Sequence, residues 1–241
     1  MEVENKIRLQ VFLSRNGVCS RRKAMSVVQE GHVSVNGKVI VEPSTPVDPK
    51  KDKVCVDGKV VDAKGYVYLM LHKPSGCVTT KSDRFADKTV LDLLPKSLQY
   101  VNPVGRLDKD TEGLLLLTND GDLTNKLTHP RFHVDKTYFV KINGKLEPRE
   151  IKRLEKGVVL EGKKTAPAKI KSIKTVGNQM TFSMTIHEGR KRQIRLMLEE
   201  VGHRVIYLKR IVQGPLKLGQ LPRGKFRALT QKEVLLLKNL L

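Results

Sequence analysis

The stretch that decides the fold is Val104–Pro130, VGRLDKDTEGLLLLTNDGDLTNKLTHP, in a chain of 241 residues. At its centre, Leu114–Leu117 is a continuous apolar run, which is typical of a strand buried on both faces. Three acids and two cations precede this run, between Gly105 and Gly113. Because glycine lets another backbone or a ligand approach closely, the stretch predicts a charged loop at the entrance to a buried sheet.

Two interpretations of Asp108 and Asp110 remain open from their spacing alone. An Asp side chain readily hydrogen-bonds to its own backbone, and the spacing favours a pair of simple turn caps. Paired carboxylates are also the groups that cleave glycosidic bonds. The absence of Trp and the basic composition speak against a glycosidase.

Outward from this stretch, strands and helices alternate over the rest of the chain. Strands are predicted at Tyr66–Leu71, Lys136–Ile142, Ala168–Val176, Met180–His187 and Arg204–Ile211. Helices are predicted at Thr89–Leu94, Asp122–Leu127, Pro148–Lys156, Lys191–Val201 and, after a Thr230/Glu233 capping box, Val234–Leu241. Antiparallel strands with peripheral helices indicate an α+β domain with a mixed, largely antiparallel sheet.

The first 64 residues have a different pattern. Helices are predicted at Ile7–Arg15 and, capped by Ser20, at Arg21–Glu30. Hairpins follow at 32–41 and 53–61, turned by Asn-Gly and Asp-Gly, the strongest short-range hairpin signal. The pattern changes near residue 65, so we predict a small two-helix and hairpin domain at 1–64 and a larger domain at 65–241.

Charge and cysteine content narrow the functional class. The net charge of +21 attracts polyanions and favours nucleic acid as the partner over a solubility role or an anionic membrane. No membrane-length apolar run or secretory signal is present, so we expect a soluble, cytoplasmic protein. Cys19, Cys55 and Cys77 lie far apart, which predicts reduced thiols and no metal site.

Phosphate contacts are expected on the N-terminal domain. Ser20–Lys23 places three cations beside a helix N-terminus, where free backbone N–H groups also suit phosphate oxygens. The run IRLQVFLSRNGVCSRRKAMSVVQEGHVSVNGKVI from residue 7 resembles the S-four RNA-binding domain, over roughly residues 7–64. That resemblance implies a grip on structured RNA. The matching cations are Arg8, Arg21, Arg22 and Lys23.

The larger domain resembles the pseudouridine synthases, in the branch that carries an S-four domain and modifies ribosomal RNA. The resemblance rests first on GRLDKDTEGLLLLTNDGDLTNKLTHP. The other matching segments, in chain order, are Leu71–Gly76 (LHKPSG), Lys136–Tyr138 (KTY), Glu188–Met197 (EGRKRQIRLM) and Leu208–Ile211 (LKRI) with Gly214–Leu216. One departure is Leu196, where many members carry a second basic residue.

The resemblance implies roles for three catalytic residues. Asp108 would be the nucleophile, either adding to C6 of a flipped-out uracil or assisting elimination at the ribose. Arg195 would form an ion pair with Asp108, since a guanidinium favours the charged form of a carboxyl. Tyr138 would stack on the base and place its hydroxyl near the proton transfer.

Further contacts follow from the same resemblance. Arg106 would fill the space that the extruded base leaves, on the same strand face as Asp108. Leu208 would pack against the base, and Lys73 would contact the substrate. RNA contacts are also expected from Arg190, Lys191 and Arg192.

The sequence therefore predicts an enzyme that isomerises one uridine of ribosomal RNA to pseudouridine. Large-subunit RNA is the favoured substrate, and small-subunit RNA is the alternative. The competing class is a non-catalytic RNA-binding protein of ribosome assembly. No cofactor and no metal are expected, because the reaction is an isomerisation, and nothing in the sequence requires more than a monomer.

Overall fold

The computed structural model describes residues 6–80 and 88–240, which form two units. Unit 1 comprises the chain up to Val67 together with Ser97–Asn102 and Asn119–Gly121. Unit 2 comprises the remaining segments. The sequence placed the boundary at residue 64 and assigned neither of the two later segments to the first unit. No helix of the described residues is long and apolar enough to cross a membrane.

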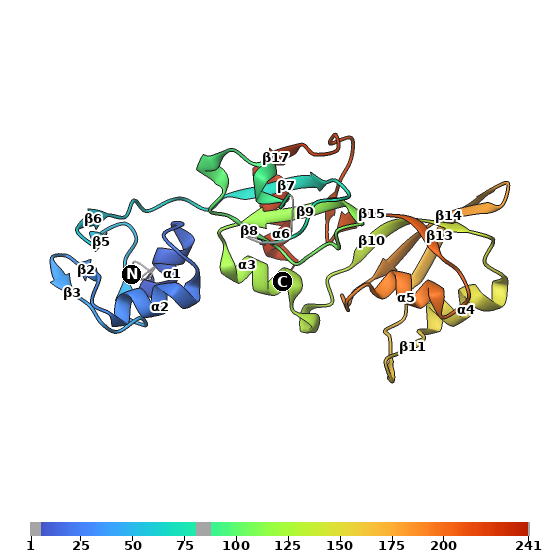
Figure 1. The fold of residues 1–241 in the computed structure, drawn as a ribbon, viewed down its shortest axis with the longest axis horizontal. Helices are drawn as coiled ribbons and strands as arrows, with labels where there is room; N and C mark the ends of the chain where they lie inside the picture. Colours follow the sequence, from blue (N-terminus) through green and yellow to red (C-terminus); the bar gives the residue numbers. More distant parts are fainter. Residues whose placement is uncertain (1–5, 81–87, 241) are drawn as a thin grey trace. The chain divides into compact units, whose positions relative to one another are not determined.

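Unit 1 combines a helix pair with a small sheet (Figure 1). Its helices are α1 (Leu9–Arg15) and α2 (Arg21–Gln29), and β1 (Ile7–Arg8) pairs with β4 (Pro46–Val47). The sheet order is β3 (Lys38–Val39), β2 (Val33–Val35), β5 (Val54–Val56) and β6 (Lys59–Val60). Residues of both helices and of β2, β4 and β5 share one core.

Local turn chemistry fixes the two hairpins of unit 1. Asn36 and Gly37 both have positive φ, 51° and 84°, as do Asp57 and Gly58, 47° and 75°. Two successive positive-φ residues give the turn that suits the twist of a two-residue hairpin. Both predicted hairpins are therefore confirmed.

The later segments join unit 1 through side chains. The Asn119 Oδ1 accepts a hydrogen bond of 2.8 Å from the Val67 N–H, and its Nδ2 donates to the Gly65 carbonyl at 3.0 Å. The Lys64 ammonium lies 4.0 Å from the centre of the Tyr100 ring. These contacts join segments far apart in sequence, which local patterns do not reveal.

Unit 2 is built on a sheet of nine strands, counted over the described residues (Figure 1). The main path is β13 (Lys169–Val176), β14 (Gln179–Ile186), β10 (Lys136–Asn143), β15 (Val205–Gln213), β9 (Glu112–Thr118), β7 (Tyr68–Lys73) and β17 (Phe226–Ala228). Two short strands complete it, β16 (Leu216–Lys217) beside β15 and β8 (Asn102–Pro103) beside β9. All residues of β9 are buried, as its leucine run predicts.

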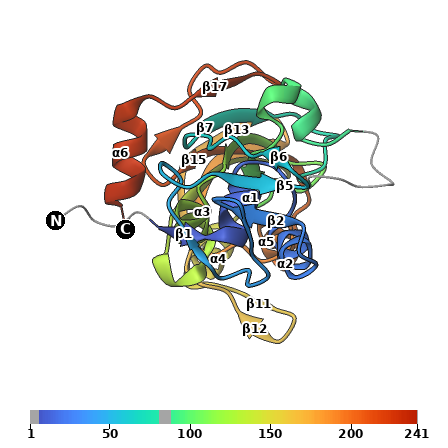
Figure 2. The same cartoon turned by 90° about the vertical axis from the view of Figure 1, so that its left-hand side faces the viewer.

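Helices cover the sheet of unit 2 in separate places. A core cluster joins α3 (Gly121–Thr128) and α6 (Gln231–Asn239) to β7 and β9. Two others, α5 (Gln193–Glu199) and α4 (Pro148–Lys156), contact β15 and β13 respectively. The hairpin of β11 (Val159–Leu160) and β12 (Lys163–Lys164) projects from the unit (Figure 2). Short 3₁₀ turns are η1 (Leu91–Leu93), η2 (Lys96–Leu98) and η3 (Pro130–Phe132).

The predicted helix Thr89–Leu94 is wrong in length, because only η1 forms there. The Thr89 N–H and hydroxyl both donate to the Asp92 carboxylate, at 2.7 and 2.9 Å, and these hydrogen bonds stabilise a single turn. Pro95 follows directly and disfavours helical geometry at Leu94. The predicted capping box of Thr230 and Glu233 is confirmed at the start of α6.

Gly113 joins the two halves of the sheet. Among the strand pairs of unit 2 in the described residues, β9 with β15 is the parallel one, and it sets Gly113 opposite Arg210. Gly113 has a φ of +110°, and a Cβ there would lie 2.2 Å from the Arg210 carbonyl oxygen. Neither the backbone angle nor the distance admits a side chain.

We therefore expect Gly113→Ala to lower the free energy of unfolding by roughly 2–5 kcal/mol, through the strained φ and the backbone clash. Chemical denaturation monitored by circular dichroism measures the change. Gly65→Ala is the matched control, since Gly65 has no positive φ and a methyl group there would have open space around it. Equal stability of the Gly113 and Gly65 variants would contradict this account.

Candidate active site

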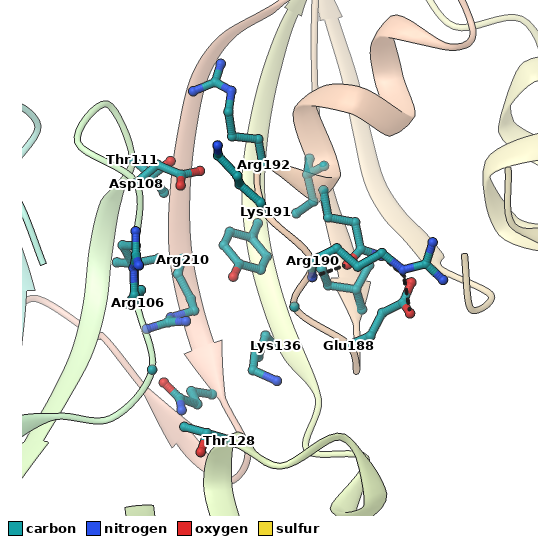
Figure 3. A pocket seen from close by; sticks show the side chains of 18 of the residues that line it. Arg106, Asp108, Thr111, Thr128, Lys136, Glu188, Arg190, Lys191, Arg192 and Arg210 are labelled. Carbon is teal, nitrogen blue, oxygen red and sulfur yellow. Dashed lines mark hydrogen bonds and ion pairs between the residues drawn. The ribbon is translucent and has the colours of Figure 1, made fainter. Parts of the chain in front are cut away.

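A cavity of about 590 Å³ opens in unit 2 beside the parallel contact of β9 and β15 (Figure 3). The loop 104–111 forms one wall, and residues 186–194, which lead from β14 into α5, form the other. Strands β10 and β15 lie at its base, where they contribute Tyr138 and Leu208. The cavity thus brings together segments that the sequence selected separately.

Asp108 lies in the wall of this cavity, on a loop whose backbone is held at both sides (Figure 3). The Thr79 hydroxyl donates to the Leu107 carbonyl at 2.7 Å, and the Thr111 N–H donates to the Asp108 carbonyl at 3.0 Å. The Asp108 side chain is half-buried. Within the part of the chain that the structure describes, its carboxylate accepts no hydrogen bond and forms no ion pair, so it remains available to a ligand.

Lys73 holds the same loop from beneath. Its side chain is fully buried and does not line the cavity. The ammonium donates to the carbonyls of Pro74, Asp108 and Thr111, at 3.1, 3.0 and 2.9 Å, with a longer contact of 3.4 Å to Lys109. The structure thus gives Lys73 a role in holding the loop, and its expected contact with substrate stays a prediction.

Arg195 pairs with Asp110 in this structure, whereas the sequence predicts an ion pair with Asp108. The Arg195 Nη2 lies 3.1 Å from the Asp110 Oδ2 and 3.2 Å from the Asp110 carbonyl oxygen. Arg192 reaches the same carboxylate at 3.5 Å. The guanidinium lines a second hollow, with Ser75 and Tyr207, and is outside the set of residues that line the main cavity.

Electrostatics at Arg195 reflect both acids. Burial lowers the pKa of Arg195, whereas Asp110 raises it, Arg192 lowers it and Asp108 raises it, in decreasing order of effect. Asp108 thus lies within electrostatic reach of the guanidinium although it makes no direct contact. The pair with Asp110 fixes the far end of the loop that carries Asp108.

Tyr138 and Leu208 both line the cavity. Tyr138 lies opposite Arg210 across the β10–β15 ladder, and Leu208 lies opposite Val140. Both are largely buried, 9% and 5% exposed, and are fixed by their strands. Arg106 also lines the cavity, but residues 106–108 form an irregular segment, so the shared face with Asp108 comes from the loop and not from a strand.

The three expected RNA-contact cations near α5 have different surroundings. Arg190 is tied to the protein, since its guanidinium donates to the Lys163 and Lys164 carbonyls at 2.9 and 2.6 Å and pairs with Glu188. Arg192 pairs with Asp110, whereas Lys191 is exposed at the cavity rim. α5 begins at Gln193 instead of Lys191 because Arg192 has a φ of 52°.

Three polar residues at the base of the cavity had no predicted role: Lys136, Arg210 and Gln213. Arg210 and Gln213 are 2% and 1% exposed. Burial, and next the charge of Arg210, lower the pKa of Lys136 to about 8. The signal that could have found them was polar residues inside strands that otherwise face a core.

In unit 1, the four predicted RNA-binding cations are exposed: Arg8, Arg21, Arg22 and Lys23. The Ser20 hydroxyl caps α2 by accepting from the Lys23 N–H at 3.3 Å, as expected. No group of three or more metal-ligating side chains suited to a metal ion occurs in residues 6–80 and 88–240.

Comparison with known proteins agrees with both units. The RNA pseudouridylate synthase family model matches residues 67–200, and the S4 (S-four) domain model matches residues 7–52. The ribosomal large subunit pseudouridine synthase B of Bacillus subtilis (strain 168) is 45% identical over 94% of this chain and 93% of its own length. An uncharacterized RNA pseudouridine synthase of Aquifex aeolicus (strain VF5) is 42% identical over 95% and 92%.

A solved structure also matches nearly the whole chain. The crystal structure of a pseudouridylate synthase has a TM-score of 0.68 and 30% identity, and covers 96% of this chain and 99% of that chain. The chain belongs to the RNA pseudouridylate synthase family. It is an isomerase that acts on RNA, and its α+β fold and S4 domain are as predicted.

Lys73 makes a testable contribution to stability. Burial lowers its pKa from 10.5 to about 8, so between these values the unfolded chain binds more protons than the folded one. The penalty of burying the charge is complete below pH 8 and is relieved as the pH rises towards 10.5. We expect the stability of wild type minus that of Lys73→Met to grow by roughly 1–3 kcal/mol over this range.

Urea denaturation at a series of pH values between 7 and 10.5 measures this difference. A constant difference across the series would show that Lys73 titrates normally in the folded protein. Lys59→Met, at an exposed position of unit 1, is the matched control and should give a flat difference.

Proposed function

We propose that this enzyme converts one specific uridine of large-subunit ribosomal RNA to pseudouridine, with Asp108 as the nucleophile on a flipped-out base. The observation that carries the proposal is the Asp108 carboxylate, which stands without a partner among the described residues in the wall of a cavity rich in cations. The choice of RNA is supported by the name of the B. subtilis relative, a ribosomal large subunit enzyme. Small-subunit RNA is the alternative outcome of the test below.

The reaction breaks the N1–C1′ bond, turns the uracil and forms a C5–C1′ bond. The C5 proton is then lost and N1 gains one, so the atoms balance without an oxidant or reductant. Asp108 supplies electrons at C6 of the base or stabilises positive charge at C1′ of the ribose. Tyr138 stacks on the detached base and brings its hydroxyl to the C5 proton, and Leu208 closes the apolar side of the pocket.

Arg195 supports this chemistry through the loop. Its pair with Asp110 positions the backbone two residues after Asp108, and its guanidinium lies within electrostatic reach of the Asp108 carboxylate. Arg106, exposed at the cavity wall, takes the place of the extruded base in the RNA stack. Lys191 contacts phosphates at the rim.

A single chain supplies every residue of this scheme, and we propose that the enzyme acts as a monomer in the compartment where ribosomal subunits are assembled. Unit 1 docks the RNA through the start of α2. Free N–H groups and the cations Arg21, Arg22 and Lys23 occur together there.

Asp108→Asn tests the catalytic assignment. Pseudouridines are mapped in ribosomal RNA from cells that lack the protein and from cells that carry wild type, Asp108→Asn or Asp122→Asn. We expect one large-subunit site to disappear, to return with wild type and with the exposed control Asp122, and to stay absent with Asp108→Asn. A neutral amide cannot act as the nucleophile, so residual activity below about one part in a thousand is expected.

Each contrary result has a distinct meaning. A site restored by Asp108→Asn overturns the nucleophile assignment. If no pseudouridine is lost in the deletion strain, the result supports the alternative of a non-catalytic RNA-binding protein. If the lost pseudouridine lies in small-subunit RNA, the choice of ribosomal subunit is overturned and the catalytic assignment stands.

Arg22→Ala combined with Lys23→Ala tests the docking role of unit 1. Each cation that meets a phosphate releases counterions, so we expect weaker RNA binding and a salt dependence lower by about 2 in log–log slope. Lys50→Ala with Lys59→Ala removes the same charge from exposed positions elsewhere in unit 1. Filter binding at several salt concentrations measures both pairs, and equal slopes would contradict docking at α2.

A further inference from the structure

The base of the cavity carries polar side chains that the mechanism above leaves unused. Across the β10–β15 ladder, Lys136 lies directly opposite Gln213, and Tyr138 opposite Arg210. The register shifts between these two pairs, so Ile211 of β15 bulges out of the ladder. The bulge turns Arg210 and Gln213 to the same face although they are three residues apart.

Two of these side chains have buried polar atoms without a partner. The Arg210 Nε donates to the Leu114 carbonyl at 2.7 Å, but its Nη2 has no hydrogen-bond partner among the described residues. The same holds for the Gln213 Oε1. Buried polar groups are normally hydrogen-bonded, because an unpaired one costs free energy. A donor and an acceptor without partners, on two residues that line the same cavity, indicate the place of a polar ligand.

Lys136 adds a second donor. Its ammonium donates to the Val134 carbonyl at 3.1 Å and, more weakly, to the His187 carbonyl at 3.4 Å. An ammonium has three N–H groups, so one remains. The open groups are therefore an acceptor on Gln213, with one donor across the ladder from it and another along its own strand.

The imide edge of uracil has the complementary sequence of groups. It presents O2, N3–H and O4, which is a donor between two acceptors. Cytosine instead presents an unprotonated N3, which is an acceptor, and an amino group at C4, which is a donor. Its N3 would therefore face the Gln213 acceptor, and its amino group would face one of the two cationic donors. We infer that Gln213 accepts from the uracil N3–H, that Arg210 and Lys136 donate to its two carbonyl oxygens, and that this contact selects uracil; the inference rests on the proposed function.

The placement agrees with the chemistry of the ring. C6 lies opposite N3, and Figure 3 shows Asp108 at one end of the cavity and Lys136 at the other. A base held by its imide edge at Lys136 and Gln213 therefore presents C6 and the glycosidic bond towards Asp108. Every group of the uracil edge then has a partner in the protein.

The isomerisation itself explains why a donor is needed on each side. Exchange of N1 for C5 is a half-turn of the base about the axis through C6 and N3. This half-turn leaves N3–H in place and interchanges O2 with O4. Gln213 keeps its hydrogen bond throughout, and Arg210 and Lys136 meet a carbonyl oxygen before and after the turn. The same three side chains thus hold substrate, detached base and product.

The test pairs a change in the protein with a change in the base. Short RNAs that contain the mapped target site are made with uridine or with 3-methyluridine at the target, and single-turnover rates are measured for wild type and Gln213→Met. We expect wild type to prefer uridine by at least about 100-fold, because the methyl group removes the N3–H and meets the amide. Gln213→Met should slow uridine by about 10- to 100-fold and leave the 3-methyluridine rate nearly unchanged.

Gln220→Met is the matched control, since it makes the same substitution at an exposed glutamine of unit 2 and should keep the wild-type ratio. Thermal unfolding checks that each variant folds. If Gln213→Met does not fold, Gln213→Asn replaces it. This variant retains the amide but shortens the side chain by one methylene group, and it should lower the ratio of the uridine rate to the 3-methyluridine rate in the same way.

Equal slowing of both RNAs by the Gln213 variant would overturn the inference while the proposed function stands. A wild type that forms no pseudouridine from the uridine RNA would overturn the proposed function, and with it the inference. A selective loss of the uridine rate supports both.

Discussion

The close approach of Gly113 to the backbone of Arg210 is the constraint on which unit 2 depends. It is the point where β9 and β15, far apart in sequence, meet in parallel and turn two groups of strands into one sheet. The loop with Asp108 enters β9 immediately before this contact, and the cavity base continues along β15 immediately after it. A backbone contact therefore fixes the position of Asp108 relative to the base-binding residues of β15. Backbone positions change less than side-chain positions do, so the geometry of the site is well determined.

The loop of Asp108 is immobilised through its main chain, and this leaves the side chain uncommitted. The buried Lys73 ammonium donates hydrogen bonds to the carbonyls of the loop, and the Arg195–Asp110 pair fixes the end of the loop. A carboxylate held by its own side-chain hydrogen bonds would have to give them up before it reacted. Preorganisation through the backbone avoids that step.

Local signals predicted the elements of this fold well, because each depends on neighbours in sequence. The Asn-Gly and Asp-Gly hairpins, the leucine run of β9 and the Thr230 capping box are of this kind. Short edge strands such as β16 and β17 have too few residues for a periodic pattern. Their existence depends on the neighbours that tertiary structure supplies.

The site was predicted in its residues more than in its contacts. Motif resemblance selected Asp108 and Arg195, but it could not decide which of two carboxylates, two residues apart, the guanidinium meets across 85 residues of chain. It chose Lys73 without the information that the side chain is buried under the loop. Gln213 escaped notice because a bulge, which breaks the two-residue period of a strand, determines the face on which it lies.

The distribution of charge around the cavity resolves a conflict between binding and chemistry. A protein that attracts RNA needs many cations. A cation bonded directly to the carboxylate of the proposed nucleophile, however, would occupy its oxygens and lower its nucleophilicity. Asp110 removes this conflict, since it takes up both Arg192 and Arg195 beside the cavity. The Arg195 charge still interacts with Asp108 through space, while the Asp108 oxygens stay open to the base. The second acid of the loop therefore has a physical reason to be there: it separates the electrostatic effect of Arg195 from its hydrogen bonds.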